Sequence, residues 1–291
     1  MAYPVRILWD TEPFFDFTSV STTGGLVFQP GASRLRTMLK DPDPGFYMTY
    51  DIGGHARERN TPFWLDFDYG SAPLTADCLF AVGIMNAAVS ILTSADKSSW
   101  SAVSRDAEWD NRMVQSRHWT RNLASKFVTF PERTARYWRV RFDPLGGALA
   151  SKMYGLLGNV LMGQHLTIPS GIRNRGDSTL IGDGAAAGGH YNPSAEDVAV
   201  FESISFGFRG ISLAEAQELK TMGYWKTNSE AIVVQYYAPA PAKADYFTAY
   251  GTLSDGVSSV PVVIDEQWEV DLKVSALTIS REASNNYHYR G

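Results

Sequence analysis

The chain has 291 residues, of which 44% are hydrophobic and 20% are charged, and its formal net charge is −5. This length suffices for a sizeable core and predicts one or two domains, and the composition excludes a wholly disordered chain. Because the chain is acidic and has no basic stripe, we expect no nucleic-acid partner recognised through its phosphates.

Aromatic residues make up 13% of the chain and accompany 25 glycines and 14 prolines, which favours a β-rich fold with many turns. The single cysteine, Cys78, excludes an intrachain disulfide and lies in an apolar run, which is typical of a buried small residue. Arg6 and Asp10 interrupt the apolar stretch at the N-terminus, and no run reaches the ~18 apolar residues of a membrane helix. We therefore expect a soluble chain from a reducing compartment, without a signal peptide or a membrane span.

The first half of the chain contains short runs that predict strands separated by turns. Residues 63–69 alternate between apolar and polar types, which places Trp64, Asp66 and Asp68 on one face of a strand. The polar residues 94–100 predict a turn that an aromatic residue closes, and residues 106–121 predict a long loop with at most a short helix. Further strands are predicted at residues 7–9, 79–84, 89–93 and 127–130.

Residues 136–142 predict the clearest amphipathic strand of the chain. Alternation places Trp138, Val140 and Phe142 on an apolar face. The opposite face carries Tyr137, Arg139 and Arg141. Because the chain as a whole is acidic, we expect the two arginines to pair with carboxylates of a neighbouring strand or subunit.

The order of these parts resembles the discoidin, or galactose-binding-like, family over residues 25–143. The resemblance rests on Leu-Asp-Phe-Asp-Tyr-Gly (65–70), on the segment from Val89 to Trp100, and on Ala-Arg-Tyr-Trp-Arg-Val-Arg-Phe (135–142). It implies a jelly-roll β-sandwich, a module that usually binds or builds and rarely catalyses. Members of this family often carry a disulfide that this chain cannot form, which favours an intracellularly assembled relative over a secreted adhesin.

The second half begins with a glycine-rich region and continues with one helix. Residues 183–189 predict a mobile loop; a phosphate-binding loop is disfavoured because Pro193 follows and no helical pattern begins. Ser212 and Glu215 form a capping box that predicts a helix over residues 212–222, with Gly223 just past its end. The core-facing stripe of this helix is predicted to be Leu213, Ala216, Leu219 and Met222.

Later strands are predicted at residues 231–237, 247–253 and 266–277, followed by a polar C-terminal arm. The layout resembles the distal tail protein group of tailed phages. The resemblance rests on the helix start Gly-Phe-Arg-Gly-Ile-Ser-Leu-Ala-Glu-Ala (207–216), on residues 158–169 and on Ala-Tyr-Gly-Thr-Leu (249–253). It implies a β-rich domain that forms a ring in the virion.

Catalytic and metal-binding patterns are scarce. The five histidines are scattered singly, which argues against a zinc site, and no Gly-x-Ser-x-Gly nucleophile motif occurs. Asp66 and Asp68 are the candidate ligands for a hard cation, although polar residues on a solvated strand face are the interpretation that we favour. We therefore expect no enzyme, no cofactor and no resident metal.

Aromatic residues in the predicted loops are the candidates for ligand binding. Trp100, Trp109 and Trp119, with Arg117, could hold a sugar through ring stacking and polar contacts. The alternative that we favour is that these tryptophans pack loops onto the sandwich or lie at subunit contacts. Arg139 and Arg141 belong to the same set of candidate glycan or interface residues.

The sequence thus predicts a mainly β protein with a jelly-roll β-sandwich at residues 1–150, a β-rich assembly domain with one helix at 151–280, and an arm at 281–291. The function we predict is a structural protein of a phage tail tip or baseplate. It would be assembled in the host cytoplasm as a homo-oligomeric ring that contacts the tail tube, hub or fibre proteins. The alternative is an adhesin module that binds host-surface carbohydrate.

Overall fold

A computed structural model of the chain shows two compact units. The sandwich unit consists of Asp10–Ser116, Leu123–Gln164 and Ala283–Gly291, and the helix unit of Met1–Trp9, Arg117–Asn122 and His165–Glu282. The structure describes residues 4–23, 36, 39–40, 58–59, 62–85, 87–104, 113–117, 123–145, 153–155, 158–169, 174–175, 179–182, 200–226, 230–237, 245–253, 257–261 and 267–283.

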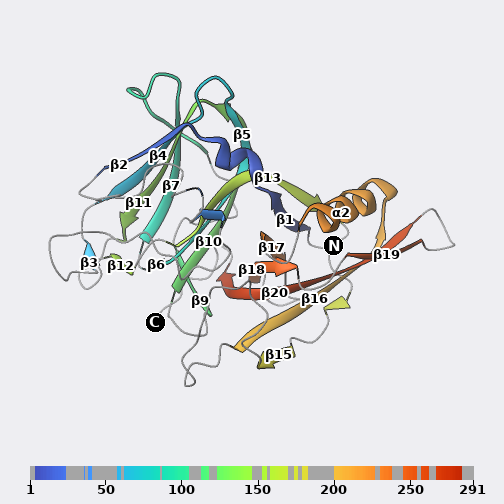
Figure 1. The fold of residues 1–291 in the computed structure, drawn as a ribbon. Helices are drawn as coiled ribbons and strands as arrows, with labels where there is room; N and C mark the ends of the chain where they lie inside the picture. The colour runs from blue at the N-terminus through green and yellow to red at the C-terminus, as the bar shows by residue number, and fades with distance from the viewer. Residues whose placement is uncertain are drawn as a thin grey trace. The chain divides into compact units, whose positions relative to one another are not determined.

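One antiparallel sheet of five strands forms the first face of the sandwich unit (Figure 1). β11 lies at its centre, because it pairs with β4 on one side and with β7 on the other. The strand order is β2 (Ser19–Thr23), β4 (Phe63–Asp68), β11 (Tyr137–Pro144), β7 (Ala87–Ser94) and β8 (Ser101–Ala102).

The second face of the sandwich is built from longer strands that also pair antiparallel. Their order is β13 (Val160–Ile168), β5 (Leu74–Val82), β10 (Leu123–Ala135) and β9 (Val114–Arg117). A small sheet of three strands completes the unit, in the order β3 (Glu58–Arg59), β12 (Met153–Gly155) and β6 (Ile84–Met85).

Alternation along β4 and β11 explains why these residues form a sandwich. The predicted apolar face of β11, with Trp138, Val140 and Phe142, is buried, and the rings of Phe63 and Phe142 stack with centroids 4.9 Å apart. Phe130 of β10 lies 6.1 Å from Trp138, so aromatic side chains join the two sheets. Each large side chain buried in this way contributes about 1.5–3 kcal/mol.

In its described residues, the helix unit consists of antiparallel strands that pack against a helix. Its core includes Ile204, Phe206, Val234 and Leu272, and the rings of Phe206 and Tyr236 meet edge to face at 5.0 Å. Its strand order is β14 (Asn174–Arg175), β16 (Val200–Ile211), β20 (Trp268–Ala283), β18 (Asp245–Leu253), β17 (Ala231–Tyr237) and β1 (Val5–Asp10), with β15 (Thr179–Gly182) on β16 and β19 (Ser258–Pro261) on β20.

The helix α2 (Leu213–Trp225) begins where the sequence predicts and ends later. The capping box is confirmed, since Ser212 Oγ accepts from Glu215 N at 3.3 Å and Glu215 Oε2 accepts from Ser212 N at 2.7 Å. Gly223 was expected past the end of the helix, and this is wrong. Gly223 is helical, and Val257 packs so closely against it that only a residue without a side chain fits there.

The predicted core stripe of α2 is correct at Ala216, Leu219 and Met222, which are buried, and wrong at Leu213, which is 47% exposed. Spacing of three residues rotates the stripe by about 60° at each step. Leu213 therefore lies on the side of the helix opposite to Met222.

Other elements differ from the sequence prediction in their extent. Residues 106–121 do not form one long loop, because they include β9 (Val114–Arg117), which pairs with β10. β20 (Trp268–Ala283) extends past the predicted strand into the first residues of the predicted arm. The predicted glycine loop at residues 183–189 and the rest of the arm lie outside the described residues.

The division into units also differs from the predicted boundaries at residues 150 and 280. β1 lies in the helix unit because it pairs with β17, and Val5 and Ile7 belong to the core of that unit. Cys78 is buried, as expected of a small hydrophobic residue. In the part of the chain that the structure describes, no helix has the length and apolarity needed to span a membrane.

Candidate functional site

A bidentate ion pair of the sandwich unit lies on the five-stranded sheet, between β4 and β11. The strand register places Arg139 directly opposite Asp66. The guanidinium binds the carboxylate with two hydrogen bonds, from Nε to Oδ1 at 2.6 Å and from Nη2 to Oδ2 at 2.8 Å. The side chains are only 6% and 17% exposed for Asp66 and Arg139, so this ion pair is shielded from water.

Two tryptophan rings explain this shielding. The Cζ atom of Arg139 lies 3.9 Å from the centroid of the Trp100 ring and 4.7 Å from that of the Trp64 ring. Trp64 lies on β4 two residues before Asp66, and Trp100 ends the loop between β7 and β8. We call Trp64, Asp66, Trp100 and Arg139 the Arg139 cluster. Cation–π contacts of this kind gain strength where water is excluded.

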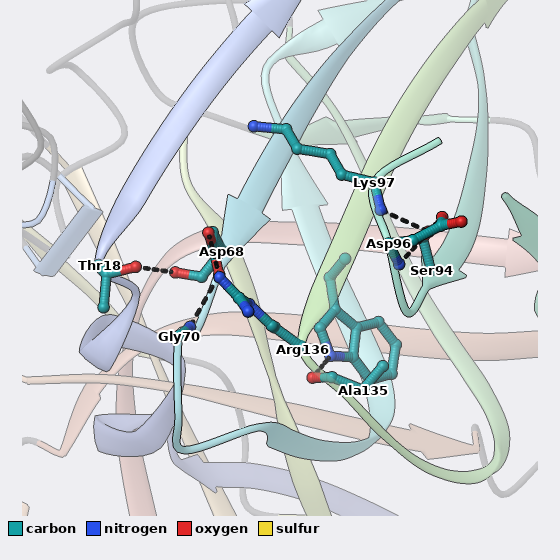
Figure 2. A network of polar contacts seen from close by, with 9 residues as sticks. Thr18, Asp68, Gly70, Ser94, Asp96, Lys97, Ala135 and Arg136 are labelled. Atoms are coloured by element: carbon teal, nitrogen blue, oxygen red, sulfur yellow. Dashed lines mark hydrogen bonds and ion pairs between the residues drawn. The ribbon is translucent and has the colours of Figure 1, made fainter. Parts of the chain in front are cut away.

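The loop that carries Trp100 is held by its own polar side chains (Figure 2). Asp96 Oδ1 accepts from the backbone N–H groups of Ser98 at 2.9 Å and Ser99 at 2.8 Å, and from Ser94 Oγ at 3.0 Å. The bond from the Ser99 backbone, together with the others, holds the pKa of Asp96 well below its ordinary value. Lys97 has φ of 64°, the left-handed conformation that lets the loop turn sharply.

A second ion pair lies at the end of β4 (Figure 2). Arg136 donates from Nε to Asp68 Oδ1 at 2.9 Å, and the backbone N–H of Gly70 donates to the same oxygen at 2.8 Å. The Arg136 guanidinium is the main cause that lowers the pKa of Asp68. Thr18 Oγ1 donates to the backbone carbonyl of Asp68 at 2.8 Å, which joins the start of β2 to this turn.

The predicted cation ligands have other partners. Asp66 is bound to Arg139 and Asp68 to Arg136, so guanidinium groups occupy the carboxylate oxygens that a metal ion would need. The expectation that Asp66 lies on a solvated face is not met, because the Arg139 cluster buries it. Arg139 pairs with a carboxylate of the neighbouring strand, as the sequence predicts, whereas Arg141 pairs with Asp143 of its own strand at 2.7 Å.

The structure brings together only some of the candidate binding residues. Trp100 and Arg139 are in contact, and Arg117 is the last residue of β9. Trp109 and Trp119 lie outside the described residues. Sequence reasoning missed Trp64 as a member of the site. Its alternation with Asp66 was visible, but nothing in the sequence showed that the ring lies over Arg139.

Two carboxyl groups at this end of the sheet are held in the charged form. A general acid in glycoside cleavage needs a carboxyl group whose pKa is raised. At the sheet end the two carboxyl groups with a resolved change, Asp68 and Asp96, have lowered pKa values instead. Both therefore remain charged near neutral pH and act as hydrogen-bond acceptors.

No protein-family model and no curated protein matches the chain. Several solved structures are similar to half of it. CpGH89CBM32-6 produced by Clostridium perfringens is 15% identical, covers 50% of this chain and 93% of its own, and has a TM-score of 0.29. The CBM32 of AlyQ in complex with 4,5-unsaturated mannuronic acid is 16% identical, covers 50% and 94%, and has a TM-score of 0.27.

A putative alpha-L-fucosidase from Bacteroides thetaiotaomicron is also similar, at 10% identity and a TM-score of 0.30. The match covers 50% of this chain and only 27% of the fucosidase chain. At identities and TM-scores this low, the likenesses carry no argument about fold or function. The solved structures that are similar to this chain include carbohydrate-binding modules and glycoside hydrolases. The comparisons show no family for the chain.

Proposed function

We propose that the sandwich unit binds carbohydrate and that Trp100 is the central contact residue. The observation that supports this proposal is a partly exposed tryptophan whose ring contacts Arg139 and whose neighbours in the sequence are exposed polar residues. Sugars present apolar C–H faces, which stack on aromatic rings, and hydroxyl groups, which need polar partners. The exposed polar neighbours of Trp100 are Lys97, Ser98, Ser99 and Ser101.

The loop is also organised before any ligand arrives. Asp96 orders the backbone that leads to Trp100, and β8 anchors the chain that follows it through pairing of Thr93 with Ser101. A contact residue that is already ordered loses little conformational entropy on binding, which raises affinity without new contacts. This arrangement supports Trp100 as a contact residue better than as a ring that only fills space.

We propose binding rather than cleavage as the activity of this surface. The carboxylates of Asp66 and Asp68 are each engaged by an arginine, and the pKa values of Asp68 and Asp96 are lowered, whereas a general acid needs a raised pKa. Such groups suit recognition of hydroxyl groups, where fixed donors and acceptors give specificity.

The proposal is tested by measuring oligosaccharide binding to the full chain. Retardation in gels that contain soluble polysaccharides (galactan, alginate, xylan or mucin) identifies the bound class, and calorimetry with a short oligosaccharide of that class gives Kd. We expect Trp100→Ala to raise Kd by about tenfold or more, as expected for loss of a main aromatic contact.

The matched control is Trp225→Ala, which removes a tryptophan that is 64% exposed on α2 in the other unit. A short, monovalent oligosaccharide keeps any change in oligomeric state out of the measurement. We expect Kd to stay unchanged in this variant. Absence of binding to every polysaccharide, or equal Kd values for Trp100→Ala and the unmodified chain, would overturn the proposal.

A second candidate function is the tail-tip role, which stays a prediction. The observation that favours it is a pair of exposed aromatic side chains at the end of α2, Tyr224 at 81% and Trp225 at 64% exposure. Exposed aromatic residues are typical of protein interfaces. The comparisons support neither a phage partner nor a ring, and the virion location is likewise untested.

A further inference from the structure

We infer that Arg139 is a positioning residue, which fixes the Trp100 ring for sugar stacking through its bidentate bond to Asp66. This inference rests on the proposed function of Trp100. It assigns a role in binding to two residues, Arg139 and Asp66, that are themselves largely covered and need not touch the ligand.

The guanidinium of Arg139 is held in one orientation. Two parallel hydrogen bonds to Asp66, at 2.6 and 2.8 Å, fix both the position and the plane of the group. A single bond would leave the plane free to rotate. Because strand pairing places the two residues directly opposite each other, this geometry is set by the rigid centre of the sheet rather than by a loop.

The orientation of the Trp100 side chain depends on this guanidinium. Trp100 precedes β8, a strand of only two exposed residues, and has no regular element of its own. Its backbone is held, since Val103 N donates to Ile91 O at 2.9 Å just beyond β8. Its ring would still sample several rotamers, but the guanidinium at 3.9 Å favours the one that stacks on it.

The centroid of the Trp64 ring lies 4.7 Å from the Cζ atom of Arg139. Trp64 belongs to β4, and its Nε1 atom is buried without a hydrogen-bond partner in the described structure. Its contact with Arg139 therefore comes from the ring system and not from its N–H group. Trp64 and Asp66 together enclose the guanidinium, which leaves the loop ring as its one movable neighbour among the members of the cluster.

Arginine is needed here for its shape as well as its charge. A planar guanidinium can bind a carboxylate with two bonds and at the same time present its faces to aromatic rings. Lysine keeps the positive charge but offers a point donor without a flat face. Arg139→Lys should therefore keep the ion pair with Asp66 and lose control of the ring.

The test compares Kd for the oligosaccharide identified above in Arg139→Lys, in Trp100→Ala and in the double variant. We expect Arg139→Lys to raise Kd by about fivefold or more, while the double variant binds no more weakly than Trp100→Ala alone. The near-ultraviolet circular dichroism of the tryptophans should change in Arg139→Lys without a large fall in Tm. The matched control is Arg136→Lys, whose bidentate ion partner is Asp68 and whose Cζ atom lies 4.7 Å from the centroid of the Tyr137 ring, and for which Kd should stay within about twofold.

The outcomes separate this inference from the proposed function. If Trp100→Ala binds like the unmodified chain, the proposed function fails. If Trp100→Ala weakens binding but Arg139→Lys does not, or if Arg139→Lys weakens binding further in the Trp100→Ala background, only the positioning role is overturned. Should Arg139→Lys not fold, Asp66→Asn takes its place in the same cycle, because it weakens the bidentate bond and leaves Arg139 present.

Discussion

At the scale of single residues, the two arginine–carboxylate pairs that involve β4 differ in their exposure. The pair of Asp66 and Arg139 is shielded by tryptophans, whereas Arg136 is half exposed beside Asp68. Solvent screens an exposed pair, so Arg136 contributes little to stability by itself. A shielded bidentate pair contributes mainly by fixing a geometry, and losing one partner leaves a buried charge uncompensated.

Asp68 gives the first prediction about stability. Its pKa is lowered from 3.8 mainly by Arg136, so its contribution to folding is fully present above 3.8 and is lost as the pH falls through the lower folded-state value. We expect the free energy of unfolding to fall more steeply between about pH 4 and about pH 2 in the unmodified chain than in Asp68→Asn. Urea unfolding followed by fluorescence measures both.

The decisive quantity is the difference between the unmodified chain and Asp68→Asn in how the free energy of unfolding changes with pH, because Asp96 and other carboxyl groups titrate in both proteins. Thr75→Ala is a suitable control, since it removes an exposed hydroxyl that bonds to Thr134 at 2.7 Å and adds no titrating group. Parallel pH profiles for Asp68→Asn and the unmodified chain would show that the Arg136 bond does not lower the pKa of Asp68.

At the scale of elements, α2 shows that a glycine can be required by packing rather than by the end of a helix. Gly223 usually would signal a helix end, because glycine adopts the left-handed conformation that terminates helices. Here a Cβ atom on residue 223 would lie 2.5 Å from Val257 Cγ2 and 2.7 Å from Val257 Cβ. The glycine is thus required by close packing, and the helix continues to Trp225.

Gly223→Ala is therefore expected to destabilise the protein although alanine is the better helix former. The propensity gain of about 1 kcal/mol is opposed by overpacking against Val257, which typically costs about 1–3 kcal/mol. We expect a net loss in the free energy of unfolding, with Tm lowered by a few degrees. Thermal unfolding followed by circular dichroism is the measurement.

The double variant with Val257→Gly provides the control for this steric explanation. Removal of Cβ and the two methyl groups of Val257 removes both of the closest contacts of the new Cβ, so the double variant should lose less than the sum of the single variants. Simple additivity of the two losses would show that Val257 is not the cause.

At the scale of the whole molecule, the chain combines a β-sandwich with a β-rich unit that carries one helix. The exposed Tyr224 and Trp225 belong to the helix unit, and the Arg139 cluster belongs to the sandwich unit. The two candidate functions thus use different surfaces. A carbohydrate-binding module and a subunit of an assembly are compatible within one chain.

The tail-tip prediction requires self-association of the purified chain. If the exposed aromatic pair forms a subunit contact, light scattering should give the mass of a closed oligomer, and Tyr224→Ser with Trp225→Ser should shift the chain towards the 32.1 kDa monomer. The control Leu213→Ser changes an exposed apolar residue at the other end of α2. A strict monomer at high concentration would contradict the ring.

Much of the fold was predictable because it depends on local patterns. Alternation in β4 and β11 gave the correct buried faces, and the Ser212–Glu215 capping box gave the start of α2. The strand β9, the true end of α2 and the membership of β1 were not predictable. β1 depends on pairing with β17, which lies far away in the sequence. β9 pairs with the next strand, β10, but the polar residues around it gave no strand signal, and nothing in the sequence showed that Val257 packs against Gly223.

In the candidate site, too, local features were predictable from the sequence and contacts between distant residues were not. Local patterns place Arg139 and Asp66 on polar strand faces and Trp100 at the close of a polar turn, since side-chain alternation and turn chemistry act between near neighbours. The contact among the four residues of the Arg139 cluster arises from the folded arrangement of the strands. That contact depends on the pairing of β4 with β11 and of β11 with β7, which brings together residues that lie up to 75 positions apart, from Trp64 to Arg139. Contacts over such separations depend on which strands pair with each other, and the pattern within one strand does not specify its partner.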